Sequence, residues 1–348
     1  MADTNDSILA MLAKFQRERD KQDALVLKQL GSAYSQLYKR LSEKIELEAR
    51  RIFENGGETV SRTWIIDRLS ALREQMTDEL KKFSTITEGA IDGQTLEALM
   101  AGGKQATAMM EAIAGGTRGF VGVDFSKLNT AQIDTMLAFL APGSPLRDKI
   151  AGMSSFHSQA VIDQLVEAIA LGYNPYKTAK NIAPFLDKVL ETAKNGMASV
   201  LADAVRMART AQIWTYRAAA QANYQANDDV VSGWQWVCSE DELVCPACLS
   251  LHGQIFESDV MQDGHYNCRC FMVPVVLGQP LISENAGQEY FDSLSEAEQR
   301  DIMGDKAYEL YKDGKISLSD FSTQKDEETY GTMRTTTSLS DLEKKAGQ

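Results

Sequence analysis

The most constraining feature of this chain is a concentration of cysteine and histidine between Trp234 and Val276. All five cysteines of the 348-residue chain and two of its three histidines lie in this window. The rest of the chain has no cysteine, and its apolar residues recur at the spacing of helices. Such a concentration has a local cause, and metal ligation is the first candidate.

Two short motifs in the window have the spacing of metal ligands. The first is Cys-Pro-Ala-Cys at 245–248, in which Pro246 favours a tight turn that aims both sulfurs at one point. The second is His-Tyr-Asn-Cys-Arg-Cys at 265–270. Two such ligand groups joined by a loop are the usual form of a structural zinc site, which is tetrahedral. The sequence therefore predicts a structural zinc ion.

A tetrahedral site needs four ligands, and the two motifs offer five. The candidates are Cys245, Cys248, His265, Cys268 and Cys270. The first four would make one complete set, and Cys270 could replace His265 or Cys268. The spacing leaves these sets open. Cys238 stands apart from both motifs and is expected in the core.

Other interpretations of the thiols are a disulfide, small buried core residues, and a redox Cys-x-x-Cys pair. No secretion signal accompanies the cysteines, which weighs against a disulfide. A redox pair is typically found next to a βαβ pattern, which this chain lacks. Free cysteines are often buried as small apolar residues, so that interpretation stays open. A catalytic zinc fits poorly, because no glutamate is placed as a general base beside a histidine pair.

The charge of the chain bears on its partners. The formal net charge is -13, and an acidic chain is repelled by DNA phosphates. The polar, acidic N-terminus does not have the pattern of a signal peptide. No apolar run approaches the about 20 residues that a membrane span needs. We therefore expect little or no direct nucleic-acid binding, no membrane association, and a reducing cytoplasm as the place of synthesis.

The N-terminal part, residues 1–83, predicts a helical hairpin. Apolar residues from Leu30 to Ile52 recur every three or four positions and define one face of a helix. Asn55-Gly56-Gly57 would end this helix, and a second apolar series runs from Ile66 to Phe83. The hairpin is either a plain packing element or a docking arm for a partner.

The remaining chain predicts four further segments. Residues 84–123 are glycine-rich and predict a mobile connector with a short helix around Leu96 to Met110. Residues 124–230 predict a helical domain, in which Pro184 breaks or kinks one helix and the last helix runs from about Met197 to Gln225. Residues 231–280 form the Cys/His-rich module. Residues 281–348 predict an acidic helical segment, with a capping box at Ser295 and Glu298, and a solvated tail. The expected fold is mainly α with a small α+β metal-stapled C-terminal module.

The same motifs resemble the core of the phage head morphogenesis family, the Mu F-type minor head proteins of tailed phages and prophages. The resemblance lies in Trp236, the 245–248 motif, Leu-His-Gly-x-x-Phe at 251–256, and the 265–270 motif with Pro274. The stretch from Gly304 to Phe321, with the pattern Gly…Tyr-x-Leu-x-x-x-Gly-x-Ile-x-Leu-x-Asp-Phe, is similar to the segment that follows this core. Two positions depart from the family pattern: Tyr266 stands where proline is usual, and Ala211 follows Ala-Arg-Thr where the family often has glutamate.

The resemblance implies a low-copy minor head (minor capsid) protein that associates with the portal protein. Scaffold and major capsid proteins are further expected partners. The implied role is head assembly and DNA packaging or ejection. The implied location is the inside of the head near the portal, after assembly in the host cytoplasm. The zinc site would then be a structural element that holds a small β-rich module together.

Two other function classes are weighed against this one. An enzyme or toxin-related domain would need a nucleophile and base from the Cys/His cluster, for example His252 near Cys248, and no complete set is evident. A nucleic-acid-binding zinc module would carry lysine and arginine around its knuckles, but Arg269 is the only one between Val231 and Val276. No catalytic residue and no organic cofactor are predicted.

Overall fold

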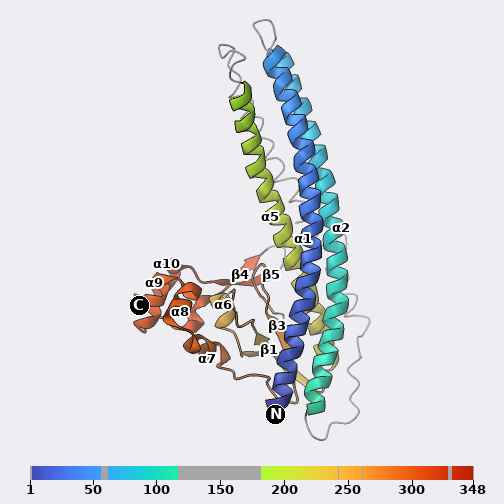
Figure 1. The fold of residues 1–348 in the computed structure, drawn as a ribbon. Coiled ribbons are helices and arrows are strands. Elements are labelled where there is room, and N and C mark those ends of the chain that lie inside the picture. Colours follow the sequence, from blue (N-terminus) through green and yellow to red (C-terminus); the bar gives the residue numbers. More distant parts are fainter. Residues whose placement is uncertain are drawn as a thin grey trace. The chain divides into compact units, whose positions relative to one another are not determined.

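The computed structural model describes residues 2–55, 62–116, 182–241, 243–260, 262–327 and 331–347. The long helices of this part are α1 (Ala2–Asn55), α2 (Arg62–Gly116) and α5 (Ile182–Ala226), and short strands and helices follow α5 (Figure 1). The predicted fold class, mainly α with a small α+β region, is therefore confirmed. The helices expected between residues 129 and 172, the helix start at Asn174-Pro175, and His157 lie outside the described residues.

The chain divides into two compact units. The first contains α1 up to residue 21, α2 from residue 95 and the described chain from residue 209 onward. The second contains α1 from residue 22, α2 up to residue 94 and α5 up to residue 208. The division expected from the order of the motifs, with boundaries after residues 83, 123, 230 and 280, stays a prediction.

In the second unit α2 returns along α1 as a helical hairpin (Figure 1). The apolar stripes that the sequence predicts face each other: Leu37 and Leu41 of α1 are buried, and so are Met76 and Leu80 of α2. α1 ends at Asn55, where the asparagine-glycine signal places its end. Spacing of apolar residues therefore predicted both helices and the faces that they bury.

A carboxylate is buried within this hairpin. The Glu79 side chain is 3% exposed and accepts hydrogen bonds from Arg40 Nε at 2.6 Å, Lys44 Nζ at 3.1 Å and Lys82 Nζ at 2.9 Å. Burial opposes ionisation of Glu79, but these three hydrogen bonds prevail and lower its pKa to about 2. The cations of both helices thus hold one ionised carboxylate between them.

Residues 84–116, in the segment expected to be a glycine-rich connector, belong to α2. α2 continues unbroken from Arg62 to Gly116, so the short interrupted helix expected around residues 96–110 was wrong. Gly102 and Gly103 are buried within α2. Each glycine lowers the stability of the helix by roughly 1 kcal/mol relative to alanine, and another interaction must compensate for that loss.

The compensation is close packing of α5 against α2 in the first unit. A Cβ on Gly102 would lie 2.4 Å from the carbonyl oxygen of Tyr216 and 3.0 Å from Cβ of Ala219. Nδ2 of Asn223 donates to the carbonyl oxygen of Gly103 at 3.1 Å. The glycine pair therefore permits an approach of two helix backbones that any side chain at residue 102 would prevent.

Helix α5 is also longer than expected. It begins at Ile182 and is unbroken to Ala226, whereas the sequence suggested a break or kink at Pro184 and a new helix near Met197. Pro184 lies in the first turn of α5, where backbone N–H groups have no partner within the helix, so proline is tolerated there. Among the described helices, none has both the length and the apolarity required to cross a membrane.

A small antiparallel sheet follows α5 in the first unit. It consists of β1 (Val231–Val237), β2 (Ile255–Phe256) and β3 (Phe271–Val276), with β1 in the centre. Trp234 of β1 lies opposite Phe256 and Pro274. Its ring stacks on Phe256 with centroids 4.6 Å apart. Both tryptophans of β1, Trp234 and Trp236, are fully buried and form the core of this sheet.

The C-terminal segment begins with short helices, as expected. They are α7 (Ala286–Ser293), α8 (Glu296–Met303), α9 (Asp305–Lys312) and a 3-10 turn, η2 (Leu318–Phe321). The predicted capping box is confirmed: Ser295 Oγ accepts from the Glu298 N–H at 3.4 Å, and the Glu298 carboxylate accepts from the Ser295 N–H at 2.8 Å. Phe291 and Phe321 form part of the buried core.

The end of the described chain is more ordered than the predicted solvated tail. β4 (Ser322–Glu327) and β5 (Gly331–Thr336) form a hairpin, and α10 (Leu339–Ala346) follows it. Met333 and Leu342 are buried at 2% exposure each. Oγ of Ser338 caps α10 by accepting from the Asp341 N–H at 3.3 Å. Threonine-rich β5 is strongly polar and buries only Met333 among its described positions, so it lacks the clear alternation by which a strand is predicted from sequence.

Candidate metal centre

The first cysteine motif forms one turn of helix after β1. Cys245 is the N-cap of α6 (Pro246–Leu249), and Pro246 occupies the first helical position, as the motif predicts. The backbone N–H of Cys248 donates to Sγ of Cys245 at 3.3 Å, so the Cys245 side chain caps the N-terminus of α6. The turn therefore brings both sulfurs to one side and supplies a hydrogen bond that stabilises a thiolate at Cys245.

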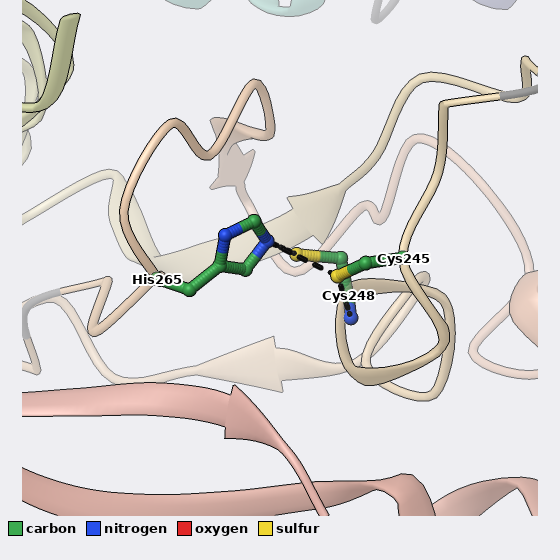
Figure 2. Close-up of side chains that lie close together, drawn as sticks. All are labelled: Cys245, Cys248 and His265. Atoms are coloured by element: carbon green, nitrogen blue, oxygen red, sulfur yellow. Dashed lines mark hydrogen bonds between the residues drawn. The ribbon is translucent and has the colours of Figure 1, made fainter. Parts of the chain in front are cut away.

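The imidazole of His265 faces these two sulfurs (Figure 2). Its Nε2 lies 3.0 Å from Sγ of Cys245 and 3.2 Å from Sγ of Cys248. Its Nδ1 lies 2.6 Å from the carbonyl oxygen of Tyr266 and donates to it. A hydrogen bond of this kind fixes the ring orientation and leaves Nε2 as the ligating atom.

The second cysteine pair completes the cluster from the loop that leads into β3. Sγ of Cys268 lies 3.7 Å from Sγ of Cys248. The potential ligand atoms form two groups of three, and within each group all atoms lie within 4.8 Å of one another. Cys248 belongs to both groups. They are Cys245, Cys248 and His265, and Cys248, Cys268 and Cys270. All five predicted ligands therefore meet in one place, although they come from separate turns.

The spacing within the cluster suits a tetrahedral ion. With zinc–sulfur bonds near 2.3 Å, two sulfurs of a tetrahedron lie about 3.8 Å apart, and sulfur and nitrogen lie about 3.6 Å apart. The Cys248–Cys268 distance of 3.7 Å matches the first value. The two sulfur–nitrogen distances, 3.0 and 3.2 Å, are shorter by a few tenths of an ångström. Small side-chain rotations would open the cluster enough for an ion.

The ionisation of the cluster is set mainly by its own members, and Arg217 contributes at Cys268. Hydrogen bonding with Cys248 is the main cause that lowers the pKa of Cys245 to about 5. Burial opposes a charge on His265 and on Cys268, but their partners within the cluster prevail. The pKa of His265 rises to about 9, and the pKa of Cys268 falls well below that of a free thiol.

The other two thiols are held in the protonated form. Hydrogen bonds with Cys245, and then with Cys268 and Cys270, raise the pKa of Cys248 well above its usual value. Burial does the same to the pKa of Cys270. Like charges so close together oppose full ionisation, and a divalent cation in their midst would remove that repulsion. The donor types, their distances and their charges thus fit a metal ion.

Cys238 and His252 lie near the cluster but belong to neither group of ligands. Cys238 is buried, as expected for a core residue. Nδ1 of His252 accepts from the Cys238 N–H at 3.1 Å, and Nε2 lies 3.0 Å from a carboxylate oxygen of Glu240. Both ring nitrogens of His252 therefore have partners, so this imidazole is poorly placed to activate a cysteine nucleophile.

Charged pairs hold the ligand-bearing loops in place. Arg269, between the two cysteines of the second motif, makes a two-pronged contact with Asp241 at 2.8 and 2.6 Å. The carboxylate of Asp263, two residues before His265, accepts from Arg334 Nε of β5 at 3.1 Å. The C-terminal hairpin thereby supports the loop that carries the histidine ligand.

Sequence reasoning missed a polar face of α5 that contacts the second motif. Oγ1 of Thr210 accepts from the Asn267 N–H at 3.2 Å, and Nη2 of Arg217 donates to Sγ of Cys268 at 2.9 Å. The hydroxyl of Tyr224 donates to the Met272 carbonyl oxygen at 2.9 Å. We call Thr210, Arg217 and Tyr224 the polar seam. Its members are fully buried and recur every seven residues, a spacing visible in the sequence.

The comparison with protein families agrees with this site. Residues 159–273 match the family model described as Phage Mu protein F like protein. The match covers about a third of the chain and includes the polar seam, β1, β2, the first half of β3 and all five candidate ligands. No curated protein and no solved structure matches the chain. The match over residues 159–273 supports the resemblance to the Mu F-like phage head morphogenesis family that the cysteine and histidine motifs indicate.

Proposed function

We propose that the chain is a minor head (minor capsid) protein of a tailed phage or prophage, associated with the portal. It acts in head assembly and in DNA packaging or ejection, and it resides inside the head after assembly in the host cytoplasm. The observation that carries the proposal is the family match over residues 159–273, which contains the whole Cys/His cluster. The acidic net charge of -13 favours protein partners over direct contact with DNA.

The metal ion of the cluster is proposed to be zinc in a structural role. Thiolate and imidazole donors at tetrahedral spacing are typical of structural zinc. Four protein ligands leave no open position for a substrate or water. The residues that would hold the ion are drawn from Cys245, Cys248, His265, Cys268 and Cys270. When bound, zinc supplies a crosslink between α6 and the start of β3, which are otherwise joined by a loop.

Metal analysis of the purified protein tests the zinc proposal. We expect one tightly held zinc per chain and loss of that zinc in the Cys248→Ser variant, because Cys248 belongs to both groups of ligands. Cys238→Ser is the matched control, since Cys238 is buried nearby but lies in neither group. A wild-type protein free of metal after purification without chelator would refute the proposal, as would equal zinc loss in both variants.

The partner surface is proposed to lie on the N-terminal hairpin. Leu25 and Leu47 of α1 are 69% and 49% exposed, although both are large and apolar. Co-expression with the portal protein of the same phage, followed by co-purification, tests this assignment. Leu25→Glu and Leu47→Glu should weaken co-purification, whereas Gln36→Glu, at an exposed polar position, should leave it unchanged. Equal recovery of the portal protein with all three variants would exclude this surface.

A structural role for the cluster, rather than a catalytic one, has its own test. The alternative enzyme would use a cysteine nucleophile, and the engaged ring nitrogens of His252 weigh against it. Cys248→Ser should lower the unfolding temperature of the module, because it removes a ligand. A Cys248→Ser protein that folds and melts like the wild type, but has lost a measurable turnover, would favour the enzyme.

A further inference from the structure

Arg217 is a buried cation beside the proposed zinc site. Its side chain is fully buried on α5, and Nη2 lies 2.9 Å from Sγ of Cys268 and 3.3 Å from the carbonyl oxygen of Cys270. Within the described parts of the chain, its Nε and Nη1 have no hydrogen-bond partner and no carboxylate pairs with it. The sulfur of Cys268 is therefore the anionic partner that the structure offers to this guanidinium.

A buried guanidinium requires a compensating negative charge, because an unpaired charge is strongly disfavoured away from water. The charge of a zinc site depends on how many thiolates it contains. Zinc with two thiolates is neutral, with three thiolates and a neutral imidazole it carries one negative charge, and with four it carries two. One buried guanidinium is balanced by the three-thiolate site.

A neighbouring glycine leaves room for this contact. A Cβ on Gly264 would lie 2.6 Å from Nη1 of Arg217 and 2.9 Å from Sγ of Cys268. Any side chain at position 264 would displace one member of the pair. The chain thus carries its smallest residue directly before His265, at the one place where the guanidinium and the sulfur meet.

We infer that Arg217 is the counter-charge of a zinc site with three thiolates, Cys245, Cys248 and Cys268, and the imidazole of His265. This rests on the zinc site proposed above and chooses among its five candidate ligands. Cys268 is included because its sulfur receives the guanidinium, whereas Cys270 is contacted through its carbonyl oxygen. His265 is included because its Nδ1 is engaged by Tyr266 and its Nε2 faces the sulfurs.

Arg19 is the other guanidinium near the cluster, and its contacts do not call for a fourth thiolate. Its Nη2 donates to the carbonyl oxygen of Arg269 at 2.7 Å, and the guanidinium lies 4.5 Å from the ring centre of Phe271. Its Nη2 also donates to Oε1 of Gln16, and among the described residues none of its hydrogen bonds reaches a sulfur. Its guanidinium is buried, with almost no exposed surface at Nη1, and its partners are the Gln16 amide oxygen, the Arg269 carbonyl oxygen and the Phe271 ring rather than a thiolate.

The number of thiolates can be counted in the wild-type protein. Cobalt replaces zinc in tetrahedral sites, and its sulfur-to-metal charge-transfer absorption grows with each thiolate ligand. We expect the intensity of three thiolates, loss of one thiolate's share in Cys268→Ser, and no change in Cys270→Ser. An intensity of two or four thiolates, or a loss with Cys270→Ser alone, would overturn the inferred ligand set.

Zinc affinity, measured by competition with a chromophoric chelator, tests the role of Arg217. Loss of an outer contact to a metal ligand typically lowers affinity about 10- to 100-fold, and we expect this for Arg217→Met. Arg217→Lys should restore part of the affinity, because it keeps the charge. Gly264→Ala should lower affinity without removing any charge. Arg206→Met, at an exposed position of the same helix, is the matched control and should bind zinc like the wild type.

The outcomes separate this inference from the zinc proposal. A wild-type protein that binds no zinc or cobalt overturns both. A wild-type protein with one zinc, together with Arg217→Met and Gly264→Ala affinities within about twofold of it, overturns only the counter-charge role. If Arg217→Met does not fold, the Gly264→Ala affinity and the cobalt spectrum of the wild type decide the question.

Discussion

The buried carboxylate of Glu79 should make the helical hairpin of the second unit sensitive to acid, and Glu79→Gln tests this. Glutamine has nearly the same shape but cannot ionise, so the variant loses the charge and keeps most of the packing. Glu79 contacts Arg40, Lys44 and Lys82 at 2.6 to 3.1 Å, and these contacts lower its pKa from 4.5 to about 2. The stability of the hairpin therefore includes an electrostatic contribution at neutral pH.

The size of the contribution follows from the pKa difference. One pKa unit corresponds to about 1.4 kcal/mol, so a change of about 2.5 units corresponds to roughly 3 kcal/mol. The three cations are 39%, 32% and 62% exposed, and solvent screens them. We therefore expect Glu79→Gln to lower the free energy of unfolding at pH 7 by about 2 kcal/mol.

The sign of the pH dependence is fixed by the direction of the shift. The folded pKa lies below the unfolded value, so the stabilisation is fully present above about pH 4.5 and is lost as the pH falls through about 2. About half of the difference between wild type and Glu79→Gln should be gone by pH 3. Urea unfolding followed by far-ultraviolet circular dichroism at pH 7, 5, 4 and 3 measures this difference directly.

Glu74→Gln is the matched control, because Glu74 is exposed on the same helix. It should change stability by less than about 0.5 kcal/mol at every pH. The reasoning about Glu79 is wrong if both variants have the same stability at pH 7. It is also wrong if the deficit of Glu79→Gln persists undiminished at pH 3, because the lost interaction would then not depend on ionisation.

Three further predictions concern the first unit. Gly102→Ala should lower the free energy of unfolding by about 1–3 kcal/mol, because its Cβ would meet the Tyr216 carbonyl. Gly93→Ala, in the part of α2 that belongs to the second unit and with nothing within 4 Å of its added Cβ, should raise it by up to about 1 kcal/mol in the same urea titration, and equal effects would contradict the packing argument. Asp241→Asn should cost about 1 kcal/mol or less in thermal unfolding, since its pairing with Arg269 is partly exposed; a larger loss would point to a further role. A zinc chelator should lower the melting temperature of the wild type but not of Cys248→Ser, and equal lowering would disprove the metal crosslink.

Local patterns in the sequence were sufficient to predict the features that depend on neighbouring residues. The hairpin stripes, the end of α1 at Asn55 and the capping box of Ser295 and Glu298 each follow from residues a few positions apart. The five candidate ligands were found for the same reason, since each motif is short. Their assembly into one cluster followed from the chemistry of zinc, which draws two such motifs together.

Features that depend on distant residues were missed. The unbroken course of α2 through Gly102 depends on the approach of α5, more than a hundred residues later in the chain, and helix propensity alone indicated a break. The sequence predicts no strands in the β4–β5 hairpin, and it predicts a tail from Thr335 onward, because these strands are polar and only Met333 of β5 is deeply buried. The role of Arg217 has no local signature, because its partner sulfur lies 51 positions away.

The polar seam of α5 shows what buried polar side chains add to a helix interface that apolar side chains could also fill. An apolar helix face can slide along a strand with little change in free energy, whereas each polar group of the seam needs particular partner atoms at hydrogen-bond distance. A shift of α5 by one residue moves it about 1.5 Å along its axis. Hydrogen-bond lengths vary over only about half an ångström, so Thr210, Arg217 and Tyr224 would lose their partners together. Since these partners lie in and just after the second ligand motif, the seam fixes one register between α5 and the chain that carries Cys268 and Cys270.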